Sequence, residues 1–227
     1  MSERMRPARR LTLTDDVYAS VQAMIMDHVV APGERISIDG LARRLDVSPT
    51  PVREALARLE SDGLVRKRPL AGYTASPLLS RAEFEELVEM RLLLEPAAAA
   101  RTARRVADGT LGGTDAARLR AEADLPDAAA GGFTGIAAFT AQDARFHNLL
   151  AGASGNGLLS DAVLRLRPHL HLFRLHFPPS HLGISATEHH RVVDAVTAGD
   201  ADGAAAAMRA HLVAARERHL PYFEEAR

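Results

Sequence analysis

The chain of 227 residues contains no cysteine and no tryptophan, and aromatic residues make up only 4% of it. Without cysteine, disulfide bonds and thiolate metal sites are excluded, so a metal site has to be built from histidine and carboxylate side chains. No apolar run is long enough to span a membrane, and the N-terminal MSERMRPARR leads into no hydrophobic segment of a signal peptide. We therefore expect a cytoplasmic protein with no membrane partner.

A large excess of charge of one sign is also missing. The formal net charge is -1 at pH 7, with 12 basic against 10 acidic residues over 1–73 and 16 against 19 in the remainder. This tilt is too small to indicate nucleic-acid binding by itself. The hydrophobic content of 47% is sufficient for the cores of two small domains.

Apolar spacing in the N-terminal part predicts three helices followed by a β-hairpin. A first helix is expected over 14–30, a short second one is capped by Ser37, and a third is capped by Thr50. Two short extended runs then flank the turn residues 69–72. This order is typical of a winged helix-turn-helix, which we assign to residues 1–76.

From Ser80 onward the pattern is helical and shows no strand. Glycine-rich breaks separate several of the predicted helices. The helices are expected at 80–106, 114–124, 133–152, 157–176, 185–198 and 200–219. The predicted fold is therefore mainly α, with an N-terminal winged helix-turn-helix that has a small β-hairpin wing and a C-terminal all-α helical bundle over 77–227.

The third predicted helix separates a polar side from a packed side. Thr50 and Arg53 share a face opposite Val52 and Leu56, as a recognition helix in the major groove requires. Arg53 can pair with a guanine edge or with a phosphate. The helix pattern alone leaves open that Arg53 is a solvated side chain and that the winged unit only contacts proteins.

The segment LARRLDVSPTPVREALARLESDGLV resembles the DNA-binding domain of the GntR family of bacterial transcription regulators. This chain has Pro49 where the family usually has a DNA-contacting arginine, so Arg53, which matches the second family arginine, is expected to contribute more of the base recognition. The operator is then expected to differ from common family sites. The residues that we expect at the DNA are Ser48, Thr50, Arg53, Arg43, Arg66, Lys67 and Gly72.

In the second half, three predicted helices each turn a histidine toward an apolar stripe. Asp143 and His147 are one helical turn apart, which suits two ligands of one metal ion. His189 and His211 follow on two further helices. Three imidazoles and one carboxylate form a reasonable set for a divalent transition metal, zinc first and nickel or manganese as alternatives. An ordinary hydrogen-bonded core of histidines is the alternative.

Residues 80–220 resemble the FadR-type effector domain of the same family, called FCD. Its metal-binding members carry an Asp-x-x-x-His pair and two later histidines, which D-A-R-F-H, E-H-H-R-V-V-D-A-V-T-A-G-D and A-A-A-A-M-R-A-H match in order. The resemblance implies that Asp143, His147, His189 and His211 are metal ligands. It also implies dimerisation through the helical domain.

Together these patterns predict a DNA-binding transcription regulator, not an enzyme. Its helical domain is expected to bind a divalent metal and a small organic acid effector that modulates binding of a homodimer to double-stranded operator DNA. Candidate effector-binding residues are Arg91, Arg145, Asn156, His171 and Arg174. The alternatives are a regulator that responds to the metal itself, a DNA-binding protein with a purely structural cluster and a metal-dependent hydrolase, for which no accompanying base motif is visible.

Overall fold

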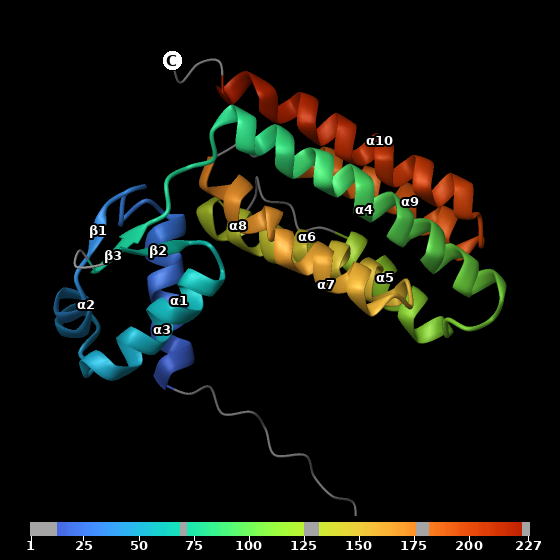
Figure 1. The fold of residues 1–227 in the computed structure, drawn as a ribbon. Helices are drawn as coiled ribbons and strands as arrows, with labels where there is room; N and C mark the ends of the chain where they lie inside the picture. Colours follow the sequence, from blue (N-terminus) through green and yellow to red (C-terminus); the bar gives the residue numbers. More distant parts are fainter. Residues whose placement is uncertain (1–12, 69–71, 125–131, 176–181, 224–227) are drawn as a thin grey trace, which may run out of the picture. The chain divides into compact units, whose positions relative to one another are not determined.

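The computed structural model describes residues 13–68, 72–124, 132–175 and 182–223, and the chain divides into two compact units, Met1–Leu78 and Leu79–Arg227 (Figure 1). Helices dominate both units, and the sheet in the described ranges has three short strands. The predicted fold class, mainly α with a small winged unit followed by an all-α bundle, is confirmed. Within these ranges, no helix is long and apolar enough to cross a membrane.

The first unit packs three helices against an antiparallel sheet. Its elements are α1 (Leu13–Met26), β1 (Arg35–Ile36), α2 (Ile38–Leu45), α3 (Pro49–Ser61), β2 (Val65–Arg68) and β3 (Gly72–Ala75). The strand order is β1-β3-β2, so a short strand before α2 adds to the predicted hairpin. The core includes Val21 and Ile25 of α1 and Val52, Leu56 and Leu59 of α3, all fully buried.

Two helix ends in this unit differ from the prediction. The recognition helix α3 begins at Pro49 with Ser48 as its N-cap, so Thr50 lies inside the helix. Helix α1 ends at Met26, because His28 takes a left-handed backbone conformation with φ of 54° and the Val30 amide donates back to the Met24 carbonyl. Glycine usually occupies such a helix end, and with histidine at this position the pattern of residues does not predict where the helix ends.

The second unit is a bundle whose longest helix, α4, lies between α10 and the α6–α7 pair (Figure 1). Its helices are α4 (Arg81–Ala107), α5 (Gly113–Ala123), α6 (Gly132–Ala153), α7 (Gly157–Leu166), α8 (Pro168–Leu172), α9 (Leu182–Thr197) and α10 (Ala201–His219), with 3-10 turns at Phe173–Leu175 and Leu220–Phe223. Ser80 begins α4 with a complete capping box to Glu83. The core combines Phe146 and Leu150 with Val192, Val196 and Met208.

The helix predicted over 157–176 is interrupted in the structure. Helix α7 ends at Leu166, Arg167 adopts a φ of 42°, and Pro168 opens α8. A proline disfavours the α conformation in the preceding residue and lacks the N–H that would continue the helix. The short α8 therefore turns away from α7 and carries His169 and His171.

Candidate functional site

The residues expected to contact DNA are all exposed in the first unit. Ser48 stands at the start of α3 with no hydrogen bond from its hydroxyl to the helix end, which leaves it available to an anion. Arg43 lies near the end of α2, Thr50 and Arg53 are on α3, and Arg66 and Lys67 are on β2. Gly72 opens β3 with a φ of 80°, a left-handed conformation that glycine tolerates best. The turn residues 69–71 lie outside the described residues.

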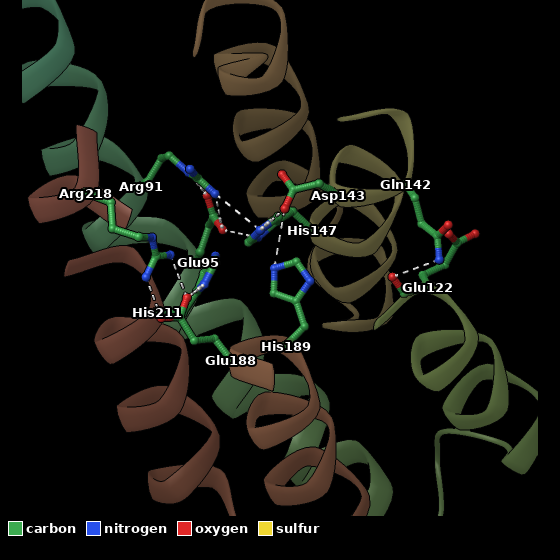
Figure 2. Close-up of polar contacts among 10 residues, drawn as sticks. All are labelled: Arg91, Glu95, Glu122, Gln142, Asp143, His147, Glu188, His189, His211 and Arg218. Atoms are coloured by element: carbon green, nitrogen blue, oxygen red, sulfur yellow. Dashed lines mark hydrogen bonds and ion pairs between the residues drawn. The ribbon is translucent and has the colours of Figure 1, made fainter. Parts of the chain in front are cut away.

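The three histidines predicted as ligands come together in the core of the second unit. His147 is on α6, His189 on α9 and His211 on α10, and each is buried (Figure 2). Each offers a ring nitrogen, and these three atoms lie within 4.8 Å of one another. Three separate helices thus place their imidazole side chains at one site.

Asp143 joins this cluster from one turn earlier on α6. Its Oδ1 atom is 3.5 Å from Nε2 of His189 and 3.9 Å from Nε2 of His147. The preceding residue, Gln142, donates from its amide to the carbonyls of Ala121 and Asp124 at 3.0 and 2.9 Å, at the end of α5. This anchor fixes the turn of α6 that carries Asp143.

His189 has an unusual environment for a polar side chain. It is fully buried, and neither of its ring nitrogens has a hydrogen-bond partner. Its ring stacks on Phe146 with a centroid separation of 4.0 Å. A buried polar group without a partner is costly, so the environment of His189 fits a ligand of an ion better than a hydrogen-bonded core residue.

His147 is backed by a glutamate and an arginine from α4. Its Nδ1 atom lies 2.6 Å from Oε2 of Glu95, although the ring N–H is not aligned for a full hydrogen bond. Arg91 in turn donates to Glu95 at 2.5 Å, and both side chains are buried. One Nη atom of Arg91 also lies 3.4 Å from Nε2 of His147, which places this guanidinium beside the cluster.

His211 has the same kind of support from the other side (Figure 2). Its Nδ1 atom is 2.8 Å from Oε2 of Glu188. Arg218 donates a hydrogen bond to each oxygen of Glu188, at 2.7 and 2.8 Å. Two of the three histidines therefore have a carboxylate behind them that an arginine holds in place. Such carboxylates fix the orientation and tautomer of a metal-ligating histidine.

The electrostatics favour neutral imidazoles and ionised carboxylates. Burial lowers the pKa of His189 and of His211, and for His211 the hydrogen bond to Glu188 offsets this only in part. Burial alone would raise the pKa of Glu188, but its hydrogen bonds with His211 and Arg218 outweigh this and bring it to about 2. Arg91 and His147 likewise hold the pKa of Glu95 far below its usual range against burial. Neutral histidine is the form that binds metals.

This arrangement fits a divalent transition metal. Four donor atoms of the correct type converge, and the 3.5 Å between Asp143 and His189 is close to the ~3.4 Å between neighbouring ligands of a tetrahedral zinc ion. The Nδ1 atoms of His147 and His211 face glutamates, which makes their Nε2 atoms the candidate ligands, and Nε2 of His147 also lies 3.4 Å from Arg91.

The residues predicted to bind an effector are only partly gathered at this site. Arg91 lies directly beside the cluster, with one Nη atom 3.4 Å from Nε2 of His147. Arg145 is exposed and pairs with Glu122 at 3.1 Å, and Asn156 caps α7 by accepting from the Leu159 amide. Arg174 is buried and His171 is half-buried, in the segment from α8 to the following turn.

Sequence reasoning missed four residues around the histidines, namely Glu95, Glu188, Arg218 and His169. Glu95 follows Arg91 by one helical turn, a spacing that predicts an ion pair but not its burial. Glu188 directly precedes His189 and supports a different histidine. Burial lowers the pKa of His169 on α8 to about 4, while the charge of Asp143 acts in the opposite direction.

Comparison with known proteins supports the same division of the chain. Residues 13–74 match the family model described as bacterial regulatory proteins, gntR family, and residues 86–214 match the FCD domain. No curated protein sequence gives a significant match.

Solved structures with a similar fold include McbR/YncC of E. coli, with 22% identity and a TM-score of 0.69 over 95% of this chain and 99% of that one. A GntR transcriptional regulator from Rhodococcus sp. RHA1 has 23% identity and a TM-score of 0.69 over 92% and 97%. Lar, which controls the agr system of Listeria monocytogenes, has 16% identity and a TM-score of 0.59 over 94% and 99%. At these identities the likeness shows a shared fold. With both domain models matched in order, the chain belongs to the GntR family of bacterial regulatory proteins and is a DNA-binding transcription regulator with an FCD effector domain.

Proposed function

We propose that this regulator binds operator DNA as a homodimer and that its helical unit holds a divalent transition metal and a small carboxylate effector. The proposed ligands are Asp143, His147, His189 and His211. The observation that carries the proposal is the fully buried His189, whose two ring nitrogens have no hydrogen-bond partner. The other three proposed metal ligands surround it, and Asp143 is 3.5 Å away. An ion at this point satisfies all four side chains.

The charge around the cluster supports an anionic effector. Arg91 and Arg218 contribute two positive charges, and Glu95, Asp143 and Glu188 contribute three negative ones. The described cluster thus carries a net charge of -1, and a divalent ion changes it to +1. A buried site with one excess positive charge attracts an anion, and a metal with open positions accepts carboxylate or hydroxyl oxygens.

A metal analysis tests the ligand set first. Untagged protein purified without chelator is measured by elemental mass spectrometry beside His211→Ala and His190→Ala. His190 is the matched control, since it neighbours His189 but pairs with Asp124 at 2.9 Å away from the cluster. About one transition metal per chain in the wild type and the control, and its loss in His211→Ala, supports the proposal. No metal in the wild type after incubation with zinc, nickel or manganese contradicts it.

The effector is tested on metal-loaded protein by calorimetric titration with small organic acids. Binding that changes operator affinity supports the effector role, because a ligand regulates only if it favours one state of the protein. Operator affinity that changes with the metal but with no organic acid favours a direct metal sensor. A change in thermal stability alone on chelation indicates a structural metal.

A further inference from the structure

The charged side chains on one side of the recognition helix α3 are held by α1. Glu54 accepts a hydrogen bond from the Thr14 hydroxyl at 2.8 Å. Arg58 pairs with Asp15 at 2.7 Å, and its guanidinium carbon lies 4.4 Å from the ring centroid of Tyr18. The carboxylate and the guanidinium on this side of α3 therefore have partners within the first unit, which leaves base recognition to the other exposed side of the helix.

That other side consists of Pro49, Thr50, Arg53 and Ala57, which we call the reading face of α3. Since each residue turns the helix by about 100°, these four side chains fall within about 100° of one another around the helix axis. Thr50, Arg53 and Ala57 are exposed, and Pro49 is half-buried. Arg53 contributes a guanidinium, Thr50 a hydroxyl and a methyl group, and Pro49 and Ala57 offer only methylene and methyl groups.

This combination matches the apolar feature of the major groove. The groove presents one apolar group, the C5-methyl group of thymine, and small apolar side chains contact it. The side chains of Pro49 and Ala57 have no hydrogen bond to offer to a base edge, so a methyl contact is the direct recognition open to them. We propose that Pro49 and Ala57 each recognise the methyl group of a thymine in the operator, one on either side of the base pair that Arg53 contacts.

The spacing along α3 sets where these thymines lie. Pro49 and Ala57 are each four residues from Arg53, in opposite directions, which corresponds to about 6 Å along the helix axis. Successive bases of one DNA strand are about 3.4 Å apart. A helix that lies along the major groove thus places the two methyl contacts about two base pairs from the Arg53 contact, on opposite sides of it. Proline suits the first helical position, where its fixed φ holds the ring in place.

The test begins with selection of operator sequences from a random duplex library by the full-length protein. Thymine is expected about two base pairs to either side of a recurring guanine. Each thymine of the selected site is then replaced singly by uracil, which removes the methyl group and keeps the base pair. The Kd is measured by fluorescence anisotropy at one salt concentration. Loss of one methyl contact is expected to raise the Kd about fourfold.

Variants of the protein assign each methyl contact to a residue. The ratio of the Kd for uracil to the Kd for thymine is compared among the wild type, Pro49→Gly, Ala57→Gly and a control, Lys67→Ala on β2. Because each ratio is taken within one variant, a general loss of affinity cancels. We expect Pro49→Gly to bring the ratio to about one at one thymine and Ala57→Gly to do so at the other. The control should bind more weakly and keep both ratios at about four.

Several results would overturn the proposal. Selection that enriches no sequence, or sites without thymine at these two positions, would do so, as would ratios of about one at every thymine in the wild type. Ratios that stay at about four in both glycine variants would also do so, since uracil then acts through DNA shape. A ratio that falls in only one variant overturns the role of the other residue. Circular dichroism verifies folding, and Pro49→Ser or Ala57→Ser replaces a glycine variant that misfolds.

Discussion

Replacing Glu188 by glutamine is expected to weaken metal binding although Glu188 is not a proposed ligand. Glu188 is ionised, buried, 2.8 Å from Nδ1 of His211 and held by the two-pronged contact of Arg218. Glutamine keeps the volume and one acceptor oxygen for the ring N–H of His211. It removes the negative charge that makes Nε2, the opposite ring nitrogen, a stronger electron-pair donor to the metal. Loss of such a supporting carboxylate weakens metal affinity about 10–100-fold, or about 1.4–2.7 kcal/mol.

The chain offers a closely matched control for this experiment. Glu85 on α4 receives the same two-pronged contact from Arg216 on α10, at 2.7 and 2.8 Å, and within the described residues it forms no hydrogen bond or ion pair with a histidine. Glu85→Gln therefore removes the same kind of ion pair without disturbing a proposed ligand. The comparison separates support of His211 from general loss of an arginine–glutamate pair.

Zinc affinity is measured by competition with a chromophoric chelator, and the absorption spectrum of the cobalt-loaded protein gives a second readout. We expect an affinity loss of about 10-fold or more and an altered cobalt spectrum for Glu188→Gln, with wild-type values for Glu85→Gln. Equal affinities in both variants, while the wild type binds zinc, would refute the supporting role of Glu188. Thermal melts without metal show whether either variant has lost stability in the unit itself.

The DNA-binding face, the metal cluster and the core of the second unit can each be tested further. Arg53→Ala should weaken operator binding by about 10–100-fold and relax specificity at one base pair. Lys67→Ala should weaken binding to all sequences alike and reduce the slope of log affinity against log salt concentration by about one. Both changes are measured by fluorescence anisotropy. Zinc at 100 times its Kd should raise the free energy of unfolding of the second unit by about 2.7 kcal/mol, and chelator should remove this gain; an unchanged denaturation midpoint would contradict metal binding to the folded state. Phe146→Ala removes the ring beneath His189 and should cost about 3–5 kcal/mol in urea denaturation, while a cost below about 1 kcal/mol would contradict its packing in the core.

The sequence predicted those features that depend on local periodicity. Phe146, His147 and Leu150 are buried on α6 as their spacing indicated, and His211 is buried on α10 beside Met208. A buried histidine on each of three helices was readable because apolar neighbours at helical spacing surround it. The predicted helix over 157–176 failed where Pro168 acts on the residue before it, a local rule that outweighs the apolar pattern.

The surroundings of the histidines depend on contacts between helices, which spacing along one helix does not contain. His211 and its supporting carboxylate Glu188 are on different helices, and Arg218 reaches Glu188 from two turns beyond His211. From the sequence alone, Glu188 is as compatible with solvent as with the core, and its neighbour His189 draws attention instead. Only the packing of α9 against α10 decides that Glu188 is buried and supports a different histidine.

The two arginine–glutamate pairs have a consequence for how the helical unit responds to an ion. The pair behind His147 consists of Glu95 and Arg91, both on α4. The pair behind His211 consists of Glu188 on α9 and Arg218 on α10. His189 has no such support and relies on the stacked ring of Phe146. A carboxylate-backed imidazole keeps its orientation whether or not an ion is present, so the ion has most effect on the side chain that nothing else holds. Structural change on metal loading is therefore expected to concentrate at His189 on α9, and hydrogen exchange should slow more in the amides around it than around His147 or His211.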